Sequence, residues 1–371
     1  MRKVKVGVIG CGQVSATYLH NCKSRFPQLE IAGCADLDSE RAVERAEQFV
    51  LPVFTVDEML QNSEVELILN LTAPKVHAEV NMKALSNGKH VYSEKPFALN
   101  LEEADHVLRF ADERGLLVGC APDTFLGGGL QTARKLIADG WIGTPYAAHA
   151  SILMGNFADG MHPNFHNFFR LGGDPLLDMA PYYVTALVAL FGPVARVTGM
   201  AAQLRQSITV ANPLSPRFGE SVTVEAPMNA AAALELGNGM LASLQAAKEG
   251  FSYSPRLEVY GTEGTLLLPD PNFFGGSIRW RGSNGQEAEF PYSHGFTEES
   301  RGLGLADLAE AIHEGRQPRA SGRLARHVLA VLLGALESAR SGHTVTIDAP
   351  CEQPEPLPMG LKYGRLSREA E

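Results

Sequence analysis

The sequence predicts two architectures in one chain: an N-terminal α/β domain with a doubly wound parallel sheet, followed by an α+β domain with a large, mostly antiparallel open sheet. Two observations support this prediction. Up to about residue 120, apolar β-branched runs alternate regularly with helical segments, which is typical of βαβ units. Beyond residue 121, several strand-like runs follow one another closely. We therefore expect the chain to divide into residues 1–122 and 123–371.

The first part of the chain alternates strand and helix throughout. The run 4–9 is β-branched and ends at Gly10, as expected for a strand buried on both faces. Ser39 is a suitable N-cap for the second helix, and Gly88 and Gly115 are placed to end two others. The sequence predicts strands over 4–9, 30–35, 66–71, 90–93 and 116–120, with helices that end at 25 and that cover 41–49, 77–87 and 102–114.

The second part contains more strands than helices. Asn238-Gly239 separates two strand-like runs and is a strong hairpin signal. A proline-rich stretch over 349–358 is expected to be extended. The predicted strands cover 147–153, 195–202, 230–236, 240–246, 257–260 and 265–268, and the predicted helices cover 130–139, 176–190, 303–314 and 324–341.

Composition excludes several classes of protein. The 371 residues include 32 Lys and Arg against 42 Asp and Glu, a formal net charge of −10, which disfavours a nucleic-acid partner. Five cysteines without a CxxC pair indicate reduced thiols and no structural zinc. No apolar run reaches the roughly 20 residues that a membrane-spanning helix needs, and the N-terminal run is too short for a signal peptide. We expect a soluble, cytoplasmic protein without a membrane partner.

A glycine-rich turn, Gly10-Cys11-Gly12-Gln13-Val14-Ser15, directly follows the first strand and opens a helix. It departs from the pattern GxGxxG only at its last position, where Ser is still small. Gly10 permits the tight turn, and Gly12 lets the backbone approach a pyrophosphate. Gln13 and Val14 lie at a helix start, which offers N–H groups and a positive dipole end. Alone, the turn is equally consistent with a plain strand-to-helix connection.

The end of the second strand favours a dinucleotide. Asp36 follows Gly12 by 24 residues, where an acid hydrogen-bonds the hydroxyls of an adenosine ribose. Leu37 follows, and not an Arg or Ser that would contact a 2′-phosphate. The sequence therefore predicts a Rossmann domain that binds NAD. NADP stays possible, because Arg41 lies on the next helix and is able to reach a phosphate.

Three further segments complete a candidate site. Thr72-Ala73-Pro74-Lys75-Val76-His77 and Glu94-Lys95-Pro96 each follow a predicted strand, and ligands of open α/β sheets bind beyond the carboxyl ends of strands. The third segment, 172–183, opens a helix in the second part of the chain. Asp178 and Tyr182 are four residues apart there, so a continuous helix would present both on one face.

Together these segments resemble the Gfo/Idh/MocA family of nicotinamide-dependent oxidoreductases. The resemblance extends to 84–96, to Tyr260-Gly261-Thr262-Glu263-Gly264 and to Gly315-Arg316-Gln317-Pro318, and so covers essentially the whole chain. It implies that Lys95 binds the reacting oxygen and helps to move its proton. The segment at Asp178 resembles the family's D-x-x-x-H pattern, but Tyr182 occupies the His position. It also implies cofactor contacts from Thr72, Pro74, His77, Glu94 and Lys95.

The chemistry of alcohol oxidation supports these roles independently. An alcohol that loses a hydride must also lose a proton, so a relay is needed within hydrogen-bond reach of its oxygen. Lys95 would be the main relay group, Tyr182 its partner and Asp178 the orienting acid. Structural alternatives stay open: a surface ion pair of Lys95 with Glu94, a charge at a helix start for Asp178, and a packed ring for Tyr182, with Tyr183 as a competitor for its role.

The segment 161–170 interleaves aromatic and polar side chains, a mixture that suits sugar rings. We expect substrate contacts from His162, Asn164 and His166, beside those from Lys95, Asp178 and Tyr182. A plain surface loop is the alternative. Two histidines four residues apart, without a third ligand, are a weak metal signal, and we predict no metal.

These observations lead to the hypothesis of an NAD(P)-dependent dehydrogenase or reductase that acts on a secondary hydroxyl or carbonyl of a sugar, cyclitol or related polyol. Two alternatives remain: an NAD-dependent glycoside-cleaving relative that uses transient oxidation, and a catalytically inactive cofactor-binding relative. Sparse helix coverage of an open sheet predicts a homodimer or homotetramer that associates through the second domain.

Overall fold

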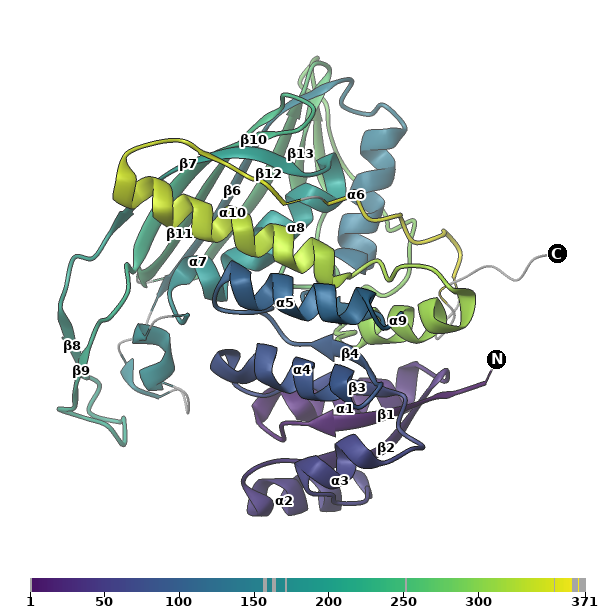
Figure 1. Cartoon of the computed structure of the whole chain (residues 1–371). Coiled ribbons are helices and arrows are strands. Elements are labelled where there is room, and N and C mark those ends of the chain that lie inside the picture. Colours follow the sequence, from purple (N-terminus) through teal and green to yellow (C-terminus); the bar gives the residue numbers. More distant parts are fainter. Residues whose placement is uncertain are drawn as a thin grey trace.

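The N-terminal sheet has five parallel strands in the order β2-β1-β3-β4-β5 (Figure 1). The computed structural model describes residues 2–155, 159–161, 165–170, 172–250, 252–349, 351–361 and 366. The strands are β1 (Val4–Ile9), β2 (Leu29–Ala35), β3 (Leu67–Asn70), β4 (His90–Ser93) and β5 (Val118–Cys120). The helices are α1 (Gln13–Arg25), α2 (Ser39–Phe49), α3 (Val56–Gln61), α4 (His77–Ser86) and α5 (Leu101–Asp112). The predicted parallel sheet is confirmed.

The strand order reverses at β1, because the chain continues from β1 to β2 on one side and then to β3 on the other. Such a switch point leaves a crevice at the carboxyl ends of the strands, where α/β proteins bind ligands. Two local predictions need correction. Asp38, and not Ser39, caps α2 by accepting hydrogen bonds from the backbone N–H groups of Glu40 and Arg41. Helix α3, which Thr55 caps, was not predicted.

The second sheet has nine strands in the order β15-β14-β13-β12-β6-β11-β10-β7-β16. Only β6 and β11 pair in parallel, so the predicted mostly antiparallel sheet is confirmed. The strands are β6 (Pro145–Gly155), β7 (Val194–Ala202), β10 (Asn229–Leu236), β11 (Leu241–Gly250), β12 (Ser254–Gly261), β13 (Gly264–Leu268), β14 (Arg279–Gly282), β15 (Glu287–Glu289) and β16 (Val345–Thr346).

Helices α8 (Ala180–Phe191) and α10 (Gly322–Ser341) lie across one face of this sheet, and α10 also contacts α5 and β5 of the first domain (Figure 1). One apolar core runs through both sheets. The remaining helices are α6 (Gly128–Ala138), α7 (Pro175–Asp178) and α9 (Leu303–Glu314), with short 3-10 helices η1 (Pro74–Val76), η2 (Thr124–Leu126) and η4 (Phe165–Phe169).

The predicted helix over 176–190 is wrong in one respect, since it is divided at Met179 into α7 and α8. Pro181 explains the division, because proline has no N–H to donate to the carbonyl of Leu177 and its ring would collide with that carbonyl. Asp174 caps α7 by accepting from the N–H groups of Leu176 and Leu177 at 3.0 and 3.1 Å. The side chains of Asp178 and Tyr182 therefore come from two consecutive helices.

A hairpin of β8 (Ser207–Thr209) and β9 (Ser221–Thr223), which was not predicted, projects from the body of the molecule (Figure 1). It has its own small apolar cluster, which includes Phe165 and Phe169 of η4. The hairpin is thus attached to the segment that sequence reasoning assigned to the substrate. Within the described residues, no helix is both long and apolar enough to cross a bilayer.

A buried carboxyl on α9 makes the stability of the fold depend on pH. Burial raises the pKa of Glu310 to about 7, and its Oε1 accepts from the N–H of Leu366 at 3.2 Å. The unfolded chain releases this proton near pH 4.3, so the free energy of unfolding falls as the pH rises from there to about 7. We expect Glu310→Gln to raise the free energy of unfolding by roughly 1–3 kcal/mol at pH 8 and little at pH 4.5, in denaturant titrations.

The control for this prediction is Glu314→Gln, which removes the same charge from an exposed side chain of α9. Equal stabilisation by both variants at pH 8 would show that net charge, and not the burial of Glu310, is responsible.

Candidate active site

The glycine-rich turn has the shape that a pyrophosphate requires. Gly10 has φ +104°, and a Cβ there would lie 2.5 Å from the carbonyl carbon of Leu71, so only glycine fits. A Cβ on Gly12 would meet nothing within 4 Å. Helix α1 begins directly after Gly12 without a side-chain cap, so the N–H groups of Gln13 and Val14 face an open space at its positive end.

Asp36 lies against this turn, as the sequence predicts for a ribose-binding acid. Its carboxylate accepts from the N–H of Cys11 at 2.7 Å and from the N–H of Asp38 at 2.9 Å. Leu37 is 95% exposed. Asp36 therefore holds the turn in place and is itself only half-buried.

The basic side chain that reaches the turn is not Arg41. Arg41 pairs with Asp38 at 3.1 Å and is mostly exposed. Instead, Arg45 from the next turn of α2 donates to the carbonyl of Gly12 at 3.3 Å. Sequence reasoning missed Arg45, which lies four residues beyond Arg41 on the same helix.

His77 joins the ends of β3 and β4. It is buried, and its Nδ1 and Nε2 lie 2.7 and 2.9 Å from the carbonyl oxygens of Pro96 and Thr72. Burial lowers the pKa of His77, although both hydrogen bonds act in the other direction. The Thr72 hydroxyl donates to Asn70, and Pro74 begins η1. His77 thus fixes the two loops that contain Thr72 and Lys95.

The segment Glu94-Lys95-Pro96 begins where β4 ends, and its Lys95–Pro96 peptide bond is cis. The Glu94 carboxylate accepts from the hydroxyl of Tyr18 at 2.8 Å and from the backbone N–H of Lys95 at 2.9 Å. Tyr18 comes from α1, so Glu94 ties the segment to the helix that starts at the glycine-rich turn.

Lys95 and Asp178 meet across the two domains. Lys95 Nζ lies 2.8 Å from Asp178 Oδ1 and 2.5 Å from the backbone oxygen of the same residue. The other carboxylate oxygen, Oδ2, lies 2.5 Å from Nζ of Lys248 on β11. The side chain of Lys248 has no exposed surface, whereas Lys95 and Asp178 keep 16% and 23% of theirs. Lys95 and Asp178 are therefore the accessible members of this group.

The charges of the group control its protonation. Burial raises the pKa of Asp178, but the ammonium groups of Lys248 and Lys95 outweigh burial and hold that pKa well below its usual range. Burial lowers the pKa of Lys95, yet Asp178, Tyr182 and Glu94 outweigh it and raise the pKa above its ordinary value. At neutral pH, Lys95 is thus an ammonium group beside an ionised carboxylate.

Tyr182 lies beside Lys95, whose Nζ is 5.4 Å from the centre of the phenol ring. The charge of Arg301 also acts on the Tyr182 hydroxyl, and the Arg301 guanidinium bonds Asn272. Burial raises the pKa of Tyr182, while the charges of Lys95 and Arg301 act against that rise. Tyr183 faces elsewhere, because its hydroxyl donates to Asp270 at 3.0 Å. Of the two tyrosines, Tyr182 is the one at the Lys95–Asp178 pair.

The predicted substrate contacts of the segment 161–170 are only partly described. His162 and Asn164 lie outside the described residues. His166 Nε2 lies 2.5 Å from Glu220 Oε1, next to the β8–β9 hairpin. Among the residues that the structure describes, no group of three or more His, Cys, Asp or Glu side chains could hold a metal ion.

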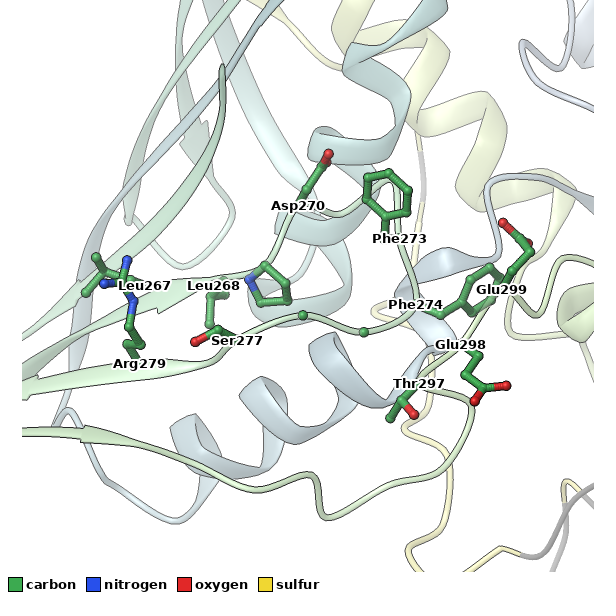
Figure 2. A pocket seen from close by; sticks show the side chains of 13 residues that line it. Leu267, Leu268, Asp270, Phe273, Phe274, Ser277, Arg279, Thr297, Glu298 and Glu299 are labelled. Atoms are coloured by element: carbon green, nitrogen blue, oxygen red, sulfur yellow. The ribbon is translucent and has the colours of Figure 1, made fainter. Parts of the chain in front are cut away.

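A cavity of about 620 Å³ has Asp270, the partner of the Tyr183 hydroxyl, in its wall. Figure 2 shows Leu267 and Arg279 at one end of it and Glu298 and Glu299 at the other. Lys95, Asp178 and Tyr182 do not line it. It is therefore separate from the candidate active site.

Besides Arg45, sequence reasoning missed three residues of the candidate active site: Tyr18, Lys248 and Arg301. Of these, only Lys248 could have been recognised from the sequence. It occupies a position at which the strand pattern Ala242, Leu244, Ala246 predicts an inward-facing apolar side chain, and a lysine there requires an explanation.

A parallel sheet with a glycine-rich turn at its switch point and an acid after its second strand defines a dinucleotide-binding protein. Residues 4–121 match the model of the oxidoreductase family with an NAD-binding Rossmann fold, and residues 130–267 match the Gfo/Idh/MocA C-terminal domain. The chain therefore belongs to the Gfo/Idh/MocA family of oxidoreductases, and its N-terminal domain is an NAD-binding Rossmann domain.

Named relatives are distant in sequence but similar over most of their length. The chain is 23% identical to scyllo-inositol 2-dehydrogenase (NAD(+)) of Bacillus subtilis, over 93% of this chain and 97% of the relative. It is 28% identical to dTDP-3,4-didehydro-2,6-dideoxy-alpha-D-glucose 3-reductase of Streptomyces violaceoruber, over 72% and 73%. The solved structure of levoglucosan dehydrogenase in complex with NADH has the same fold, with a TM-score of 0.81, 18% identity and coverage of 94% and 100%.

Proposed function

We propose that this protein transfers a hydride between NAD and a secondary hydroxyl or carbonyl of a sugar, cyclitol or related polyol. The observation that carries the proposal is the Lys95–Asp178 ion pair, which lies where β4 ends and keeps partial solvent access. It adjoins Tyr182, and it lies at the same edge of the parallel sheet as the glycine-rich turn, because both follow the carboxyl ends of strands. The names of the relatives, an inositol dehydrogenase and a sugar reductase, support this substrate class.

The residues present fit NAD. The open space over Gly12, the start of α1 and the carboxylate of Asp36 would hold the pyrophosphate and the ribose. Thr72, Pro74, His77 and Glu94 belong to the segments that follow β3 and β4, at the same edge of the sheet. When bound, NAD supplies the carbon that accepts or donates the hydride. We propose NAD in preference to NADP, because Asp36 would repel a 2′-phosphate and Arg41 is paired with Asp38.

Lys95 and Tyr182 have different roles at the substrate oxygen. The Lys95 ammonium donates a hydrogen bond to that oxygen and stabilises negative charge as it develops. The Tyr182 hydroxyl, between two cations, exchanges the proton that leaves or joins the oxygen. Asp178 orients Lys95 and accepts from a neighbouring substrate hydroxyl.

The test is a screen for NADH formation with the purified protein, NAD and a panel of inositols, hexoses and anhydrosugars. We expect at least one compound with a secondary hydroxyl to be oxidised, and slower turnover with NADP. A chromogenic glycoside, assayed without added cofactor, serves as the comparison. Release of its aglycone, without oxidation of any free polyol, would contradict the proposal.

A matched pair of tyrosine variants tests the role of Tyr182. We expect Tyr182→Phe to lower kcat by roughly 100-fold, because it removes the proton-exchanging hydroxyl and keeps the ring. Tyr183→Phe removes a hydroxyl that contacts Asp270 and should leave kcat within a small factor of the native value. Steady-state kinetics with the best substrate of the screen measure both. Equal kcat values for the two variants would show that Tyr182 is a packed ring only.

We also propose a homodimer or homotetramer in the cytoplasm, formed through the second sheet. Its face opposite α8 and α10 exposes small side chains of neighbouring strands, together with Met200 and Leu241. Contiguous exposed side chains of this kind are typical of an interface between copies. Light scattering that gave the mass of one chain at micromolar concentration would contradict the oligomer.

A further inference from the structure

We propose that Lys248 is a positioning residue of the candidate active site: it holds the Asp178 carboxylate against Lys95 and at the same time anchors the Gly172-Gly173 turn. The inference rests on the proposed function, and it assigns a role to the most buried charge of the site. Lys248 is the eighth residue of β11 and its side chain points from the covered face of the sheet toward α7.

A lysine without exposed side-chain surface needs acceptors that replace water, because an unpaired buried ammonium is very costly. Lys248 Nζ has the carboxylate of Asp178 at 2.5 Å and the backbone oxygen of Gly173 at 2.6 Å. The ring of Phe168 lies 4.8 Å away and adds a cation–π contact. These partners belong to α7, to the turn before it and to η4, so one ammonium joins three segments.

The turn at Gly173 could not adjust if Lys248 were lost. A Cβ on Gly173 would lie 1.8 Å from the backbone oxygen of Asn167, so the turn already packs directly on η4. Gly172 has φ +84°, a conformation that glycine adopts readily. The carbonyl of Gly173 then points at Lys248 and would lose its partner there. Lys248 therefore satisfies the carbonyl of a turn that packing on η4 already fixes, and so ties the start of α7 to β11.

The same contact orients the carboxylate. Asp178 has two oxygens, and Lys248 takes Oδ2 while Lys95 takes Oδ1. With Lys248 in place, Asp178 cannot rotate its Oδ1 away from Lys95 without breaking a buried ion pair. Lys248 has no surface from which to contact a substrate, so it acts through Asp178 and not on the reacting atoms.

Kinetics of Lys248→Met are the first test. Removal of a residue that orients a catalytic group typically costs 10–100-fold in activity. We expect kcat to fall by about that factor, with the KM for NAD unchanged, and Lys248→Arg to recover part of the loss. The control is Lys89→Met: Lys89 is also buried, but its ammonium bonds two backbone oxygens, of Asn62 and Val65, and lies away from the site. Equal kcat for folded Lys248→Met and Lys89→Met would overturn the proposal.

The second test needs no substrate, so it separates this inference from the proposed function. Asp178→Asn leaves the buried Lys248 beside Lys95 without a carboxylate, and we expect Tm to fall by roughly 5 °C. Addition of Lys248→Met should then raise Tm, whereas in the native background it should lower Tm. The same decrease in both backgrounds would show that Lys248 does not act through Asp178. Suppose that no polyol is oxidised, but Lys248→Met raises Tm in the Asp178→Asn background and lowers it in the native background. The proposed function then fails, and the coupling between Lys248 and Asp178 is still supported.

Discussion

Replacement of Lys95 by Met is expected to lower turnover by about 10³-fold, the upper end of the range for a lost donor that stabilises developing negative charge. Lys95 is the accessible ammonium of the site, and the Asp178 carboxylate, 2.8 Å away, keeps it protonated. Met preserves the length of the side chain but offers neither a hydrogen bond nor a proton. The substrate oxygen would then develop charge without a partner.

Two measurements separate this role from cofactor binding. Titration of the variant with NADH, followed by fluorescence, should give a Kd close to the native value. Lys95→Arg keeps the charge on a larger, planar group that cannot take the same position against the substrate oxygen, so its turnover should lie between those of the native enzyme and Lys95→Met. Near-native turnover of Lys95→Met would contradict the proposed mechanism.

The second large effect is expected at Gly12. Gly12→Val places a branched side chain in the open space next to the start of α1, where the pyrophosphate would lie. Nothing in the protein lies within 4 Å of the new Cβ, and φ is −70°, so we expect normal folding and a Tm near the native value. NADH affinity should decrease on the order of 100-fold, about 2.7 kcal/mol.

Gly10→Val is the matched comparison, since it lies two residues away in the same turn. Its Cβ would lie 2.5 Å from the carbonyl carbon of Leu71 in a backbone conformation with positive φ, so it should lower Tm strongly. Calorimetry for Tm and NADH titration for binding distinguish the two variants. If Gly12→Val binds NADH normally, the pyrophosphate does not lie over this turn.

Local pattern predicted most of the first domain, because a buried parallel strand, its glycine-rich turn and the acid after the next strand are all close in sequence. Gly10, Gly12 and Asp36 lie together as expected. The division of the predicted helix 176–190 at Met179 could also be predicted, because Pro181 lies inside that helix. The spacing of Asp178 and Tyr182 predicts that both lie on one helix face, but Pro181 between them has no N–H to donate and divides the helix.

Contacts between distant segments were not predictable in this way. Lys248 follows Asp178 by 70 residues and Arg301 follows Tyr182 by more than 100, so neither spacing carries a periodic signal. The long segment before Gly172 has mixed aromatic and polar character, which predicts sugar binding and surface loops equally. The sequence therefore predicts Lys95, Asp178 and Tyr182 as site residues, whereas the partners that set their charges, Lys248 and Arg301, are found only in the structure.

The position of β6 has a consequence for the order of assembly of the chain. β6 ends at Gly155, but its two neighbours, β11 and β12, begin only at Leu241 and Ser254. During synthesis, the strand pairs of the first sheet are complete once residue 120 has emerged, whereas β6 has no neighbouring strand until the chain reaches Leu241, 86 residues after Gly155. Contacts this far apart slow folding and leave strand edges open to aggregation. Expression at low temperature, or with chaperones, should therefore improve the yield of this protein through its second domain.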